Sequence, residues 1–574
     1  MRSSTLEYRY RFVCLVNRYV EIRSDLLVLD AGRLDAGRLD EEPVTAWPCH
    51  CDVETGCKAR GSVARTCPPQ KPIIRGSSGH IPTSQEGTLM AQEVQRLLIS
   101  GEPVAAASGQ TYEKTSALTG RVVSVASAGG PADVDLAVAS ASQAFSTWSR
   151  TPAAERAAVL HRASEILNSR SAQIATTMTE ELGATHGWGM FNCMFAAGIL
   201  AAAADLPAQV RDEPLGSGVP GLGARAVRRP KGVVAAIAPW NAPVILGARA
   251  VAAPLALGNT VVFKASEECP RTHAAIVQAL IDAGVPPGAV NLITNRPGDG
   301  PAVVERLVDH PVVRHVNFTG SSSVGRLVAV RAAQNLKPTL LELGGKAPFI
   351  VCEDADLDEA ASAASFGAFM NSGQICMSTE RVIVHADVAE RFAGLLADRA
   401  RKLAPGDPAD PTTAVGPVVS LAAAARLEEL IADATERGAR VIVGGRVDGV
   451  MVEPAVLVDV TPAMRLYDEE SFGPVVTVTA VADDEEAIRL ANDTGYGLSA
   501  AVFSRDIQRA EAVAARIDSG ICHINGATVH DEPHVPFGGI KDSGWGRFGG
   551  VYAIDEFMDT RWVTCQDGSR HYPI

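Results

Sequence analysis

From about residue 230 onward, short apolar runs alternate with longer segments of mixed polarity. KGVVAAIAP (231–239) and TVVFKAS (260–266) are continuous apolar runs of strand length, each followed by proline or polar residues. PRTHAAIVQALIDAG (270–284) has helical spacing, a proline at its start and a glycine at its end. VRHVNFTG (313–320) predicts another strand, followed by a Gly/Ser turn and a helix that begins near Val324. Strands that alternate with helices predict parallel sheets with crossover connections.

Further strand-like runs follow in the second half of the chain and predict a second α/β domain. They are KAPFIV, RVIVHADV, RVIVGG, VVTVTAV and LSAAVFS. No repeat of 20 to 50 residues is evident, so a solenoid or propeller is not indicated. The longest apolar region, 232–263, is interrupted by prolines and by Arg249, so we predict two buried strands around a helix and not a membrane span.

Composition narrows the class of protein. The chain has 574 residues, of which 47% are hydrophobic and 21% charged, as in globular proteins of two to four domains. A net charge of −14, without a basic stripe, argues against nucleic acid or anionic membrane as a partner. The first thirty residues contain no signal-peptide h-region. We therefore expect a cytoplasmic enzyme with reduced thiols.

The first 89 residues differ from the rest of the chain. They hold five of the eleven cysteines and a tandem duplication, DAGRLDAGRLD. CHCDVETGC (49–57) suggests a metal site, but its spacing does not match the paired C-x2-C arrangement of zinc sites. The alternatives are a disordered leader or an over-long translation start, and we expect the working protein to begin near Met90. This segment is expected to contribute nothing to catalysis.

Several residues have both a structural and a chemical interpretation when each is considered alone. Cys376, in MNSGQICMSTERV, fits a core residue, a disulfide half, a metal ligand or a nucleophile. Glu342, in LLELGGKAPFIV, fits a turn cap or a desolvated base. Asn241, in PWNAP, fits a cap for the helix that begins at Pro243 or a donor to an oxyanion. The loop FTGSSSVGR (318–326) suits an anion, but it matches neither G-x-G-x-x-G nor a Walker A loop.

Taken together, seven motifs resemble the aldehyde dehydrogenase superfamily in order and spacing. They are PWNAPVILG, VVFKASE, GVPPGAVNLIT, FTGSSSVGR, ELGGK, GQIC and EESFGPV. The resemblance extends from Met90 to Thr564 and implies an α/β fold with three parts. These are a Rossmann-like NAD-binding domain (90–211 and 231–343), a catalytic α/β domain (344–555) and a small β oligomerisation arm (212–230 and 556–574). Because an isolated arm exposes a strand edge, a homodimer or homotetramer is expected.

The resemblance also assigns roles to the ambiguous residues. Cys376 is implied as the nucleophile that forms a thiohemiacetal and then a thioester, Asn241 as the oxyanion donor, and Glu342 as the base for thioester hydrolysis. The implied cofactor residues are Trp240, Lys264, Glu267, Gly320, Ser321, Glu470 and Phe472. A carboxylate at Glu267 favours NAD over NADP, although Lys264 leaves NADP possible. No metal is required.

A narrower likeness concerns the aldehyde. FMNSGQICMSTERVIV and VPFGGIKDSGWGRFGG resemble the bacterial branch of salicylaldehyde, benzaldehyde and vanillin dehydrogenases. The substrate tunnel implied by this likeness is formed by Ala242, Ile245, Leu246, Arg249, Ile375 and Met377. Arg249 has two interpretations: a contact with a phenol or carboxylate of the substrate, or a salt bridge in the tunnel wall. Other wall candidates are Trp188, Phe191, His530 and His534.

Alternative functions remain at this point. A broad or aliphatic aldehyde or semialdehyde dehydrogenase has the same catalytic residues. A CoA-acylating dehydrogenase has no need of the base Glu342, and a cysteine hydrolase needs a histidine beside Cys376. A non-catalytic binding protein on the same scaffold is expected to lack Cys376, Glu342 or Asn241, and all three are present.

Overall fold

The computed structural model describes residues 93–574. The predicted leader (1–89), its duplication and the cysteine-rich segment 49–57 lie outside the described residues.

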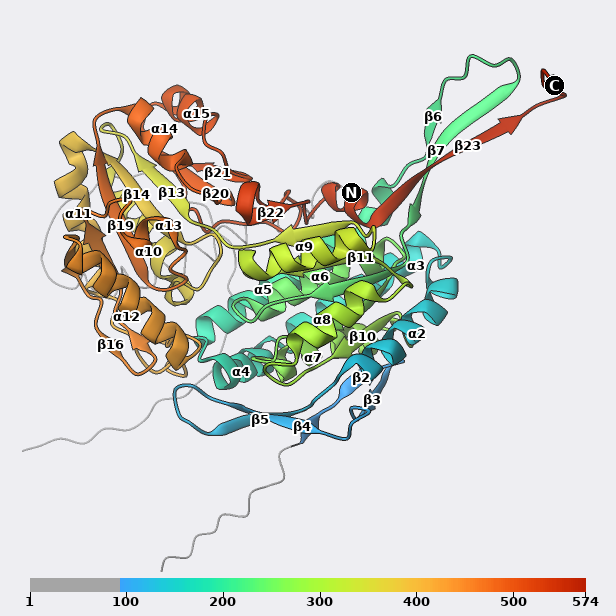
Figure 1. Cartoon of the computed structure of the whole chain (residues 1–574), viewed down its shortest axis with the longest axis horizontal. Helices are drawn as coiled ribbons and strands as arrows, with labels where there is room; N and C mark the ends of the chain where they lie inside the picture. The colour runs from blue at the N-terminus through green and yellow to red at the C-terminus, as the bar shows by residue number, and fades with distance from the viewer. Residues whose placement is uncertain (1–92) are drawn as a thin grey trace, which may run out of the picture. The chain divides into compact units, whose positions relative to one another are not determined.

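The larger of two central sheets has eight strands, in the order β22-β12-β11-β8-β9-β10-β2-β3. The five strands from β12 to β10 are parallel. The chain forms β8, β9 and β10 in one direction and then returns to place β11 and β12 on the other side of β8 (Figure 1). This reversal brings the carboxyl ends of β8 and β11 together, which is where open α/β sheets bind ligands. The strands are β2 (Leu97–Ile99), β3 (Glu102–Val104), β8 (Val233–Ile237), β9 (Thr260–Lys264), β10 (Val290–Ile293), β11 (Val313–Thr319), β12 (Thr339–Glu342) and β22 (Gly544–Trp545).

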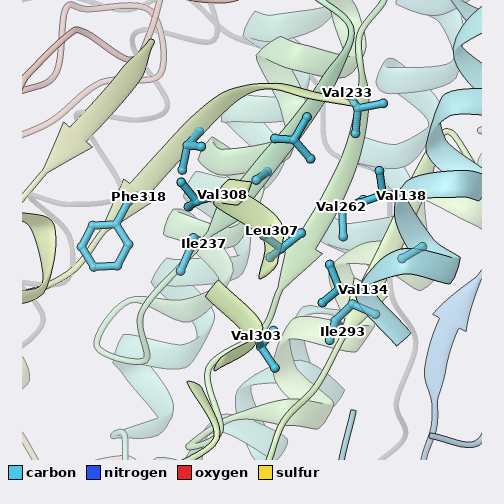
Figure 2. Packing of buried hydrophobic residues seen from close by; sticks show 14 of the residues in the cluster. Val134, Val138, Val233, Ile237, Val262, Ile293, Val303, Leu307, Val308 and Phe318 are labelled. Atoms are coloured by element: carbon cyan, nitrogen blue, oxygen red, sulfur yellow. The ribbon is translucent and has the colours of Figure 1, made fainter. Parts of the chain in front are cut away.

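Helices cover both faces of this sheet. One face is covered by α2 (Pro131–Trp148), α8 (Gly300–Asp309) and α9 (Ser322–Gln334). Of the remaining helices, α6 (Pro243–Ala256) contacts β8, β9 and β11, and α7 (Pro270–Asp282) contacts β10. Figure 2 shows Val134 of α2 and Leu307 of α8 against Ile237 and Val262 of the strands. Alternate strand residues face one side, so a continuous apolar run such as β8 supplies both faces of the sheet.

An apolar helix, α5 (His186–Ala204), packs against α3 (Ala153–Ser169), α4 (Ser171–Leu182) and α6. Together with the short turn that follows it, to Gln209, it has the length and composition of a membrane span. Because 61% of its apolar window is buried inside the protein, we interpret α5 as a core helix.

The second central sheet has seven strands, in the order β15-β18-β19-β14-β13-β20-β21, and all neighbours except β15 and β18 are parallel. The helices α10 and α11 cover one face, and α14 and α15 the other. The strands are β13 (Ala347–Val351), β14 (Thr379–His385), β15 (Arg440–Val443), β18 (Ala455–Val458), β19 (Val475–Val481), β20 (Ser499–Phe503) and β21 (Ile521–Ile524). The helices are α10 (Leu357–Phe369), α11 (Ala386–Ala400), α12 (Leu421–Glu436), α13 (Arg465–Asp468), α14 (Asp484–Asn492) and α15 (Ile507–Ala514).

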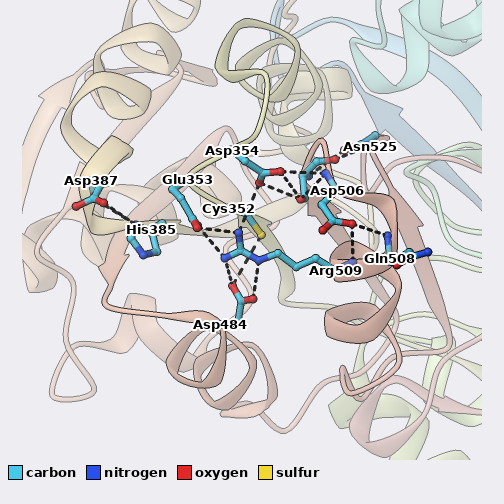
Figure 3. A network of polar contacts seen from close by, with 11 residues as sticks. Cys352, Glu353, Asp354, His385, Asp387, Asp484, Asp506, Gln508, Arg509 and Asn525 are labelled. Atoms are coloured by element: carbon cyan, nitrogen blue, oxygen red, sulfur yellow. Dashed lines mark hydrogen bonds and ion pairs between the residues drawn. The ribbon is translucent and has the colours of Figure 1, made fainter.

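A polar network just beyond the carboxyl end of β13 joins this strand to α14 and α15 (Figure 3). Arg509 donates to both oxygens of Glu353, at 2.8 and 2.7 Å, and to both oxygens of Asp484, at 2.7 Å each. The backbone N–H of Asp506 donates to Asp354 at 2.9 Å. One guanidinium therefore links three elements by paired, charge-assisted hydrogen bonds.

Smaller sheets complete the described part of the chain. In one of them β7 (Leu222–Pro230) lies between β6 (Glu213–Leu215) and β23 (Met558–Gln566), which follows α16 (Tyr552–Phe557). The strands β7 and β23 pair antiparallel along nine residues (Figure 1), and Met558 is the only residue of these two strands that is buried. The others contain β1 (Val94–Gln95), β4 (Thr111–Thr115) and β5 (Val122–Ser127), and β16 (Val447–Asp448) and β17 (Met451–Val452).

The predicted α/β fold is confirmed. The apolar region 232–263 is divided into β8, α6 and β9, as its interruptions predicted. The strand predicted at 313–320 is β11, and the helix predicted near Val324 begins two residues earlier, at Ser322.

Candidate active site

The candidate residues lie at the carboxyl ends of four strands of the larger sheet. Trp240 and Asn241 come after β8, Glu267 after β9, and Gly320 after β11. Glu342 is the last residue of β12 and is paired with Thr319. Because these strands are parallel and adjacent, their carboxyl ends form one edge of the sheet, and the candidates gather along it.

Asn241 is fixed beside the cysteine loop. Its Nδ2 donates to the carbonyl of Gln374 at 3.0 Å. Its own carbonyl accepts from Trp188 Nε1 at 3.1 Å and from Asn371 Nδ2 at 2.9 Å. The helix cap considered for Asn241 is not formed, since α6 has Ala242 at its N-cap and no side-chain capping bond. The amide is therefore oriented by the loop that carries Cys376.

Cys376 lies in a tight turn that precedes β14. In the segment just before this turn (Met370–Gly373), Asn371 and Ser372 have positive φ angles of 49° and 56°, a conformation that costs energy for residues other than glycine. The turn packs directly on the ELGGK segment. A Cβ at Gly345 would lie 2.1 Å from the carbonyl oxygen of Cys376. Only glycine permits this approach, which fixes Cys376 close to the end of β12.

Burial controls the protonation of this cluster. Burial raises the pKa of Glu342 to about 7; the Cys376 thiol and Arg249 oppose the shift, and Asp531 adds to it. Both carboxylate oxygens of Glu342 are buried, and the Cys376 thiol is the side chain placed to donate to them. Burial, followed by the carboxylates of Glu342 and Glu470, holds the pKa of the Cys376 thiol well above its ordinary value. The thiol is therefore neutral in this state, beside a carboxylate suited to accept its proton.

The EESFGPV segment contributes a second buried carboxylate. Glu470 accepts from the backbone N–H of Gly345 at 2.8 Å, and burial raises its pKa to about 8. The segment is held by Glu380, which accepts from the backbone N–H of Ser471 at 2.8 Å and from that of Phe472 at 3.2 Å. Glu380 in turn pairs with the buried Lys346 at 2.6 Å.

The cofactor candidates form a surface suited to a dinucleotide. Lys264 Nζ lies 2.9 Å from Glu267 Oε2 at the end of β9. Ser321 caps α9, where its Oγ accepts from the N–H of Val324 at 3.4 Å, and the exposed start of this helix is a favourable site for phosphate. The rings of Trp240 and Phe472 meet edge to face at 5.8 Å between centroids.

A glycine at the start of α9 keeps this surface close to the sheet. A Cβ at Gly325 would lie 2.4 Å from the Leu343 side chain. The N–H of Gly320 also donates to the carbonyl of Glu342 at 3.0 Å, which joins the phosphate loop to β12. The ends of three strands thus present a carboxylate for a ribose hydroxyl, the start of a helix for the phosphates and an aromatic ring. This combination of groups fits a nicotinamide dinucleotide.

The tunnel candidates differ in exposure and contacts. Ala242, Ile245, Leu246, Arg249, Ile375 and Met377 are all buried. Trp188 stacks on Phe191 at 5.5 Å between ring centroids, beside Asn241. His530 and His534 are about half exposed, and their Nε2 atoms lie 3.7 and 3.6 Å from the carboxylate of Glu532.

Arg249 forms the salt bridge that was one of its two interpretations. Its Nη2 pairs with Oδ2 of Asp531, and its guanidinium lies 4.1 Å from the centre of the Phe537 ring. The two side chains are 5% and 11% exposed. Burial raises the pKa of Asp531, and Arg249 opposes this shift.

Sequence analysis missed three charged residues of this region. Glu380 stands in the motif around Cys376, and Lys346 in ELGGK, but neither position shows a pattern that distinguishes a buried ion pair from a surface charge. Asp531 lies between His530 and His534 in a polar loop, and nothing in the local sequence marks it as buried. Its partner Arg249 lies 282 residues earlier, so only the fold reveals the pair. Within 93–574 no group of three or more His, Cys, Asp or Glu side chains is arranged to hold a metal.

Comparison with known proteins agrees with this geometry. Residues 104–563 match the model of the aldehyde dehydrogenase family. A vanillin dehydrogenase from Pseudomonas sp. strain HR199 is 54% identical over 478 residues, which cover 83% of this chain and 99% of that protein.

The solved structures that resemble this fold include other aldehyde dehydrogenases. The crystal structure of a salicylaldehyde dehydrogenase from Pseudomonas putida G7, complexed with salicylaldehyde, has a TM-score of 0.82 and 39% identity, and it covers 84% of this chain and 100% of that one. A betaine aldehyde dehydrogenase from Staphylococcus aureus, in complex with NAD+, has a TM-score of 0.81 and 31% identity, covering 83% of this chain and 96% of that one. With a family match across most of its length, this chain belongs to the aldehyde dehydrogenase family.

Proposed function

We propose that this protein oxidises aromatic aldehydes of the vanillin, salicylaldehyde or benzaldehyde type to carboxylic acids, with NAD as the oxidant, in the cytoplasm. The observation that carries the proposal is the convergence of Asn241 and Glu342 on the loop of Cys376. The aromatic class is supported by the similarity to a vanillin dehydrogenase and a salicylaldehyde dehydrogenase.

In the first chemical step, Glu342 accepts the proton of the Cys376 thiol. A carboxyl with a pKa of about 7 is poised for this exchange at neutral pH. The thiolate then attacks the aldehyde carbon and forms a thiohemiacetal. The oxyanion of that intermediate accepts from Asn241 Nδ2, which the neighbouring loop already orients, and from the backbone N–H of Cys376.

When bound, the nicotinamide cofactor supplies the acceptor for the hydride that leaves the thiohemiacetal carbon. The remaining species is a thioester on Cys376. After releasing its first proton, Glu342 takes a second one from water, which attacks the thioester and frees the acid. The buried site keeps other water from the intermediate.

Cofactor binding would use the residues at the strand ends. Ser321 and the start of α9 would hold the pyrophosphate, and Glu267 would accept from the ribose 2′-OH. We propose NAD as the preferred cofactor because the Glu267 carboxylate repels a 2′-phosphate. Lys264, which pairs with Glu267, leaves some NADP use open. Glu470 and Phe472 would position the nicotinamide end.

The sheet of β6, β7 and β23 supports assembly into a homodimer or homotetramer. Its outer strands leave backbone groups unpaired, and Trp562 on β23 is 69% exposed. A second copy of the chain would pair with the free backbone groups and cover the Trp562 side chain. A further apolar surface on α9 includes Leu327 and Val330, which are 71% and 60% exposed.

The test is NADH formation from benzaldehyde, salicylaldehyde, vanillin and hexanal, each with NAD and with NADP. A kcat/KM that favours the aromatic aldehydes supports the proposal, and equal or better use of hexanal overturns the aromatic class. Cys376→Ala is expected to abolish NADH formation while the enzyme still binds NAD. The matched control is Cys565→Ala, at an exposed thiol on β23, which is expected to turn over normally.

A further inference from the structure

The Arg249–Asp531 pair leaves one polar atom without a partner. Oδ2 of Asp531 is engaged by Arg249, and the backbone N–H of Glu532 favours the ionised carboxylate, but Oδ1 is buried and no side chain of the described residues donates to it. A buried carboxylate oxygen without a partner is costly and rare in native proteins. A ligand that donates a hydrogen bond there would remove this cost.

The charge of Arg249 is already compensated inside the protein. Its guanidinium is paired with Asp531 and lies over the Phe537 ring, and its side chain is 5% exposed. An anionic group on a substrate would compete with Asp531 for the same cation and leave one of the two carboxylates unpaired and buried. The pair therefore presents an acceptor and not a net positive charge.

The position of the pair suits the far edge of an aromatic ring. Arg249 lies six residues beyond Pro243, so its Cα is about 9 Å further along α6 from the helix start next to Asn241. Side chains on a helix lean toward its N-terminus, which returns the guanidinium toward Cys376. The charges of Arg249 and Asp531 both act on Glu342, in agreement with this placement.

We propose that Asp531 is a specificity-determining residue whose unpartnered Oδ1 accepts a hydrogen bond from a ring hydroxyl of a neutral phenolic aldehyde. This inference rests on the proposed aromatic function and goes beyond it. It implies that the enzyme selects hydroxyl-bearing rings over their methyl ethers and discriminates against aldehydes that carry a carboxylate.

The experiment compares matched substrate pairs on the wild-type enzyme. For 4-hydroxybenzaldehyde against 4-methoxybenzaldehyde, and for the corresponding 3- and 2-substituted pairs, kcat/KM is expected to favour the hydroxyl form at one ring position by about 10- to 100-fold, the range of a hydrogen bond to a charged group. This part needs no variant, and the absence of a preference at every position overturns the inference.

Asp531→Asn then tests the residue itself. Asparagine keeps the shape, but its carbonyl oxygen replaces Oδ2 toward Arg249, so an N–H donor replaces the acceptor at Oδ1. The hydroxyl-to-methoxy ratio is expected to fall close to one. Because the ratio is taken on one enzyme, a general loss of activity cancels. The matched control is Glu532→Gln, at a neighbouring acid that is 43% exposed, which is expected to leave the ratio unchanged.

The two proposals fail in different ways. Better use of hexanal than of any aromatic aldehyde by the wild-type enzyme refutes the aromatic function. A preference for aromatic aldehydes whose hydroxyl-to-methoxy ratio is the same in Asp531→Asn leaves that function in place and refutes the role of Asp531.

Discussion

The contact between Gly345 and Cys376 makes a strong prediction about catalysis. In Gly345→Ala the added Cβ would lie 2.1 Å from the carbonyl oxygen of Cys376, whereas real Cβ atoms essentially never approach closer than 3.0 Å. The two backbones must therefore separate by about 1 Å. The neighbouring turn is already constrained by the positive φ angles of Asn371 and Ser372, so Cys376 has to move with its loop.

A shift of this size displaces the nucleophile from Asn241 and Glu342. A misplacement of about 1 Å in an active site costs on the order of 100-fold in rate. We therefore expect kcat/KM to fall about 100-fold, which corresponds to about 2.7 kcal/mol of transition-state stabilisation. Overpacking also lowers the free energy of unfolding, by about 1–3 kcal/mol.

The assay is steady-state NADH formation, together with circular dichroism and thermal unfolding to confirm that the variant is folded. The matched control is Gly394→Ala on α11, an exposed helical glycine with no heavy atom within 4 Å of the added Cβ. This control should keep full activity and gain up to about 1 kcal/mol of stability. A folded Gly345→Ala enzyme with wild-type kcat/KM would refute the reasoning.

Two further predictions concern proton transfer and stability. Because burial raises the pKa of Glu342 to about 7 and the base must be deprotonated, kcat should rise with pH through about 7. Glu342→Gln should slow thioester hydrolysis and remove this rise from the pH profile of kcat. A pH profile that is the same in Glu342→Gln as in the wild-type enzyme would contradict the role of Glu342 as the base. Arg509→Ala breaks the paired contacts with Glu353 and Asp484 and should lower the free energy of unfolding by about 2 kcal/mol in chemical denaturation, less at high salt. Arg505→Ala, at a side chain that is 71% exposed, should cost less than about 0.5 kcal/mol, and equal effects of the two variants would show that the network adds nothing.

Local patterns in the sequence predicted several strands and helices of the two large sheets in their order along the chain. The apolar runs that became β8, β9 and β11 are buried on both faces, so their composition alone marks them as strands of a parallel sheet. The local sequence left the roles of Cys376 and Glu342 open, and the resemblance to aldehyde dehydrogenases assigned them. The strand and helix predictions depend on local patterns, in which each residue's environment follows from its near neighbours.

The contacts between residues far apart in the sequence, and the pKa shifts that follow from them, depend on how the chain packs. Asn241 donates to a carbonyl 133 residues later, and Arg249 pairs with Asp531 282 residues away. No local pattern encodes such pairs, because they arise only when separate segments pack together. The raised pKa of Glu342 has the same origin. The local sequence fits either a turn cap or a desolvated base, and the fold selects the base because burial of the carboxylate outweighs the opposing effects of the Cys376 thiol and Arg249.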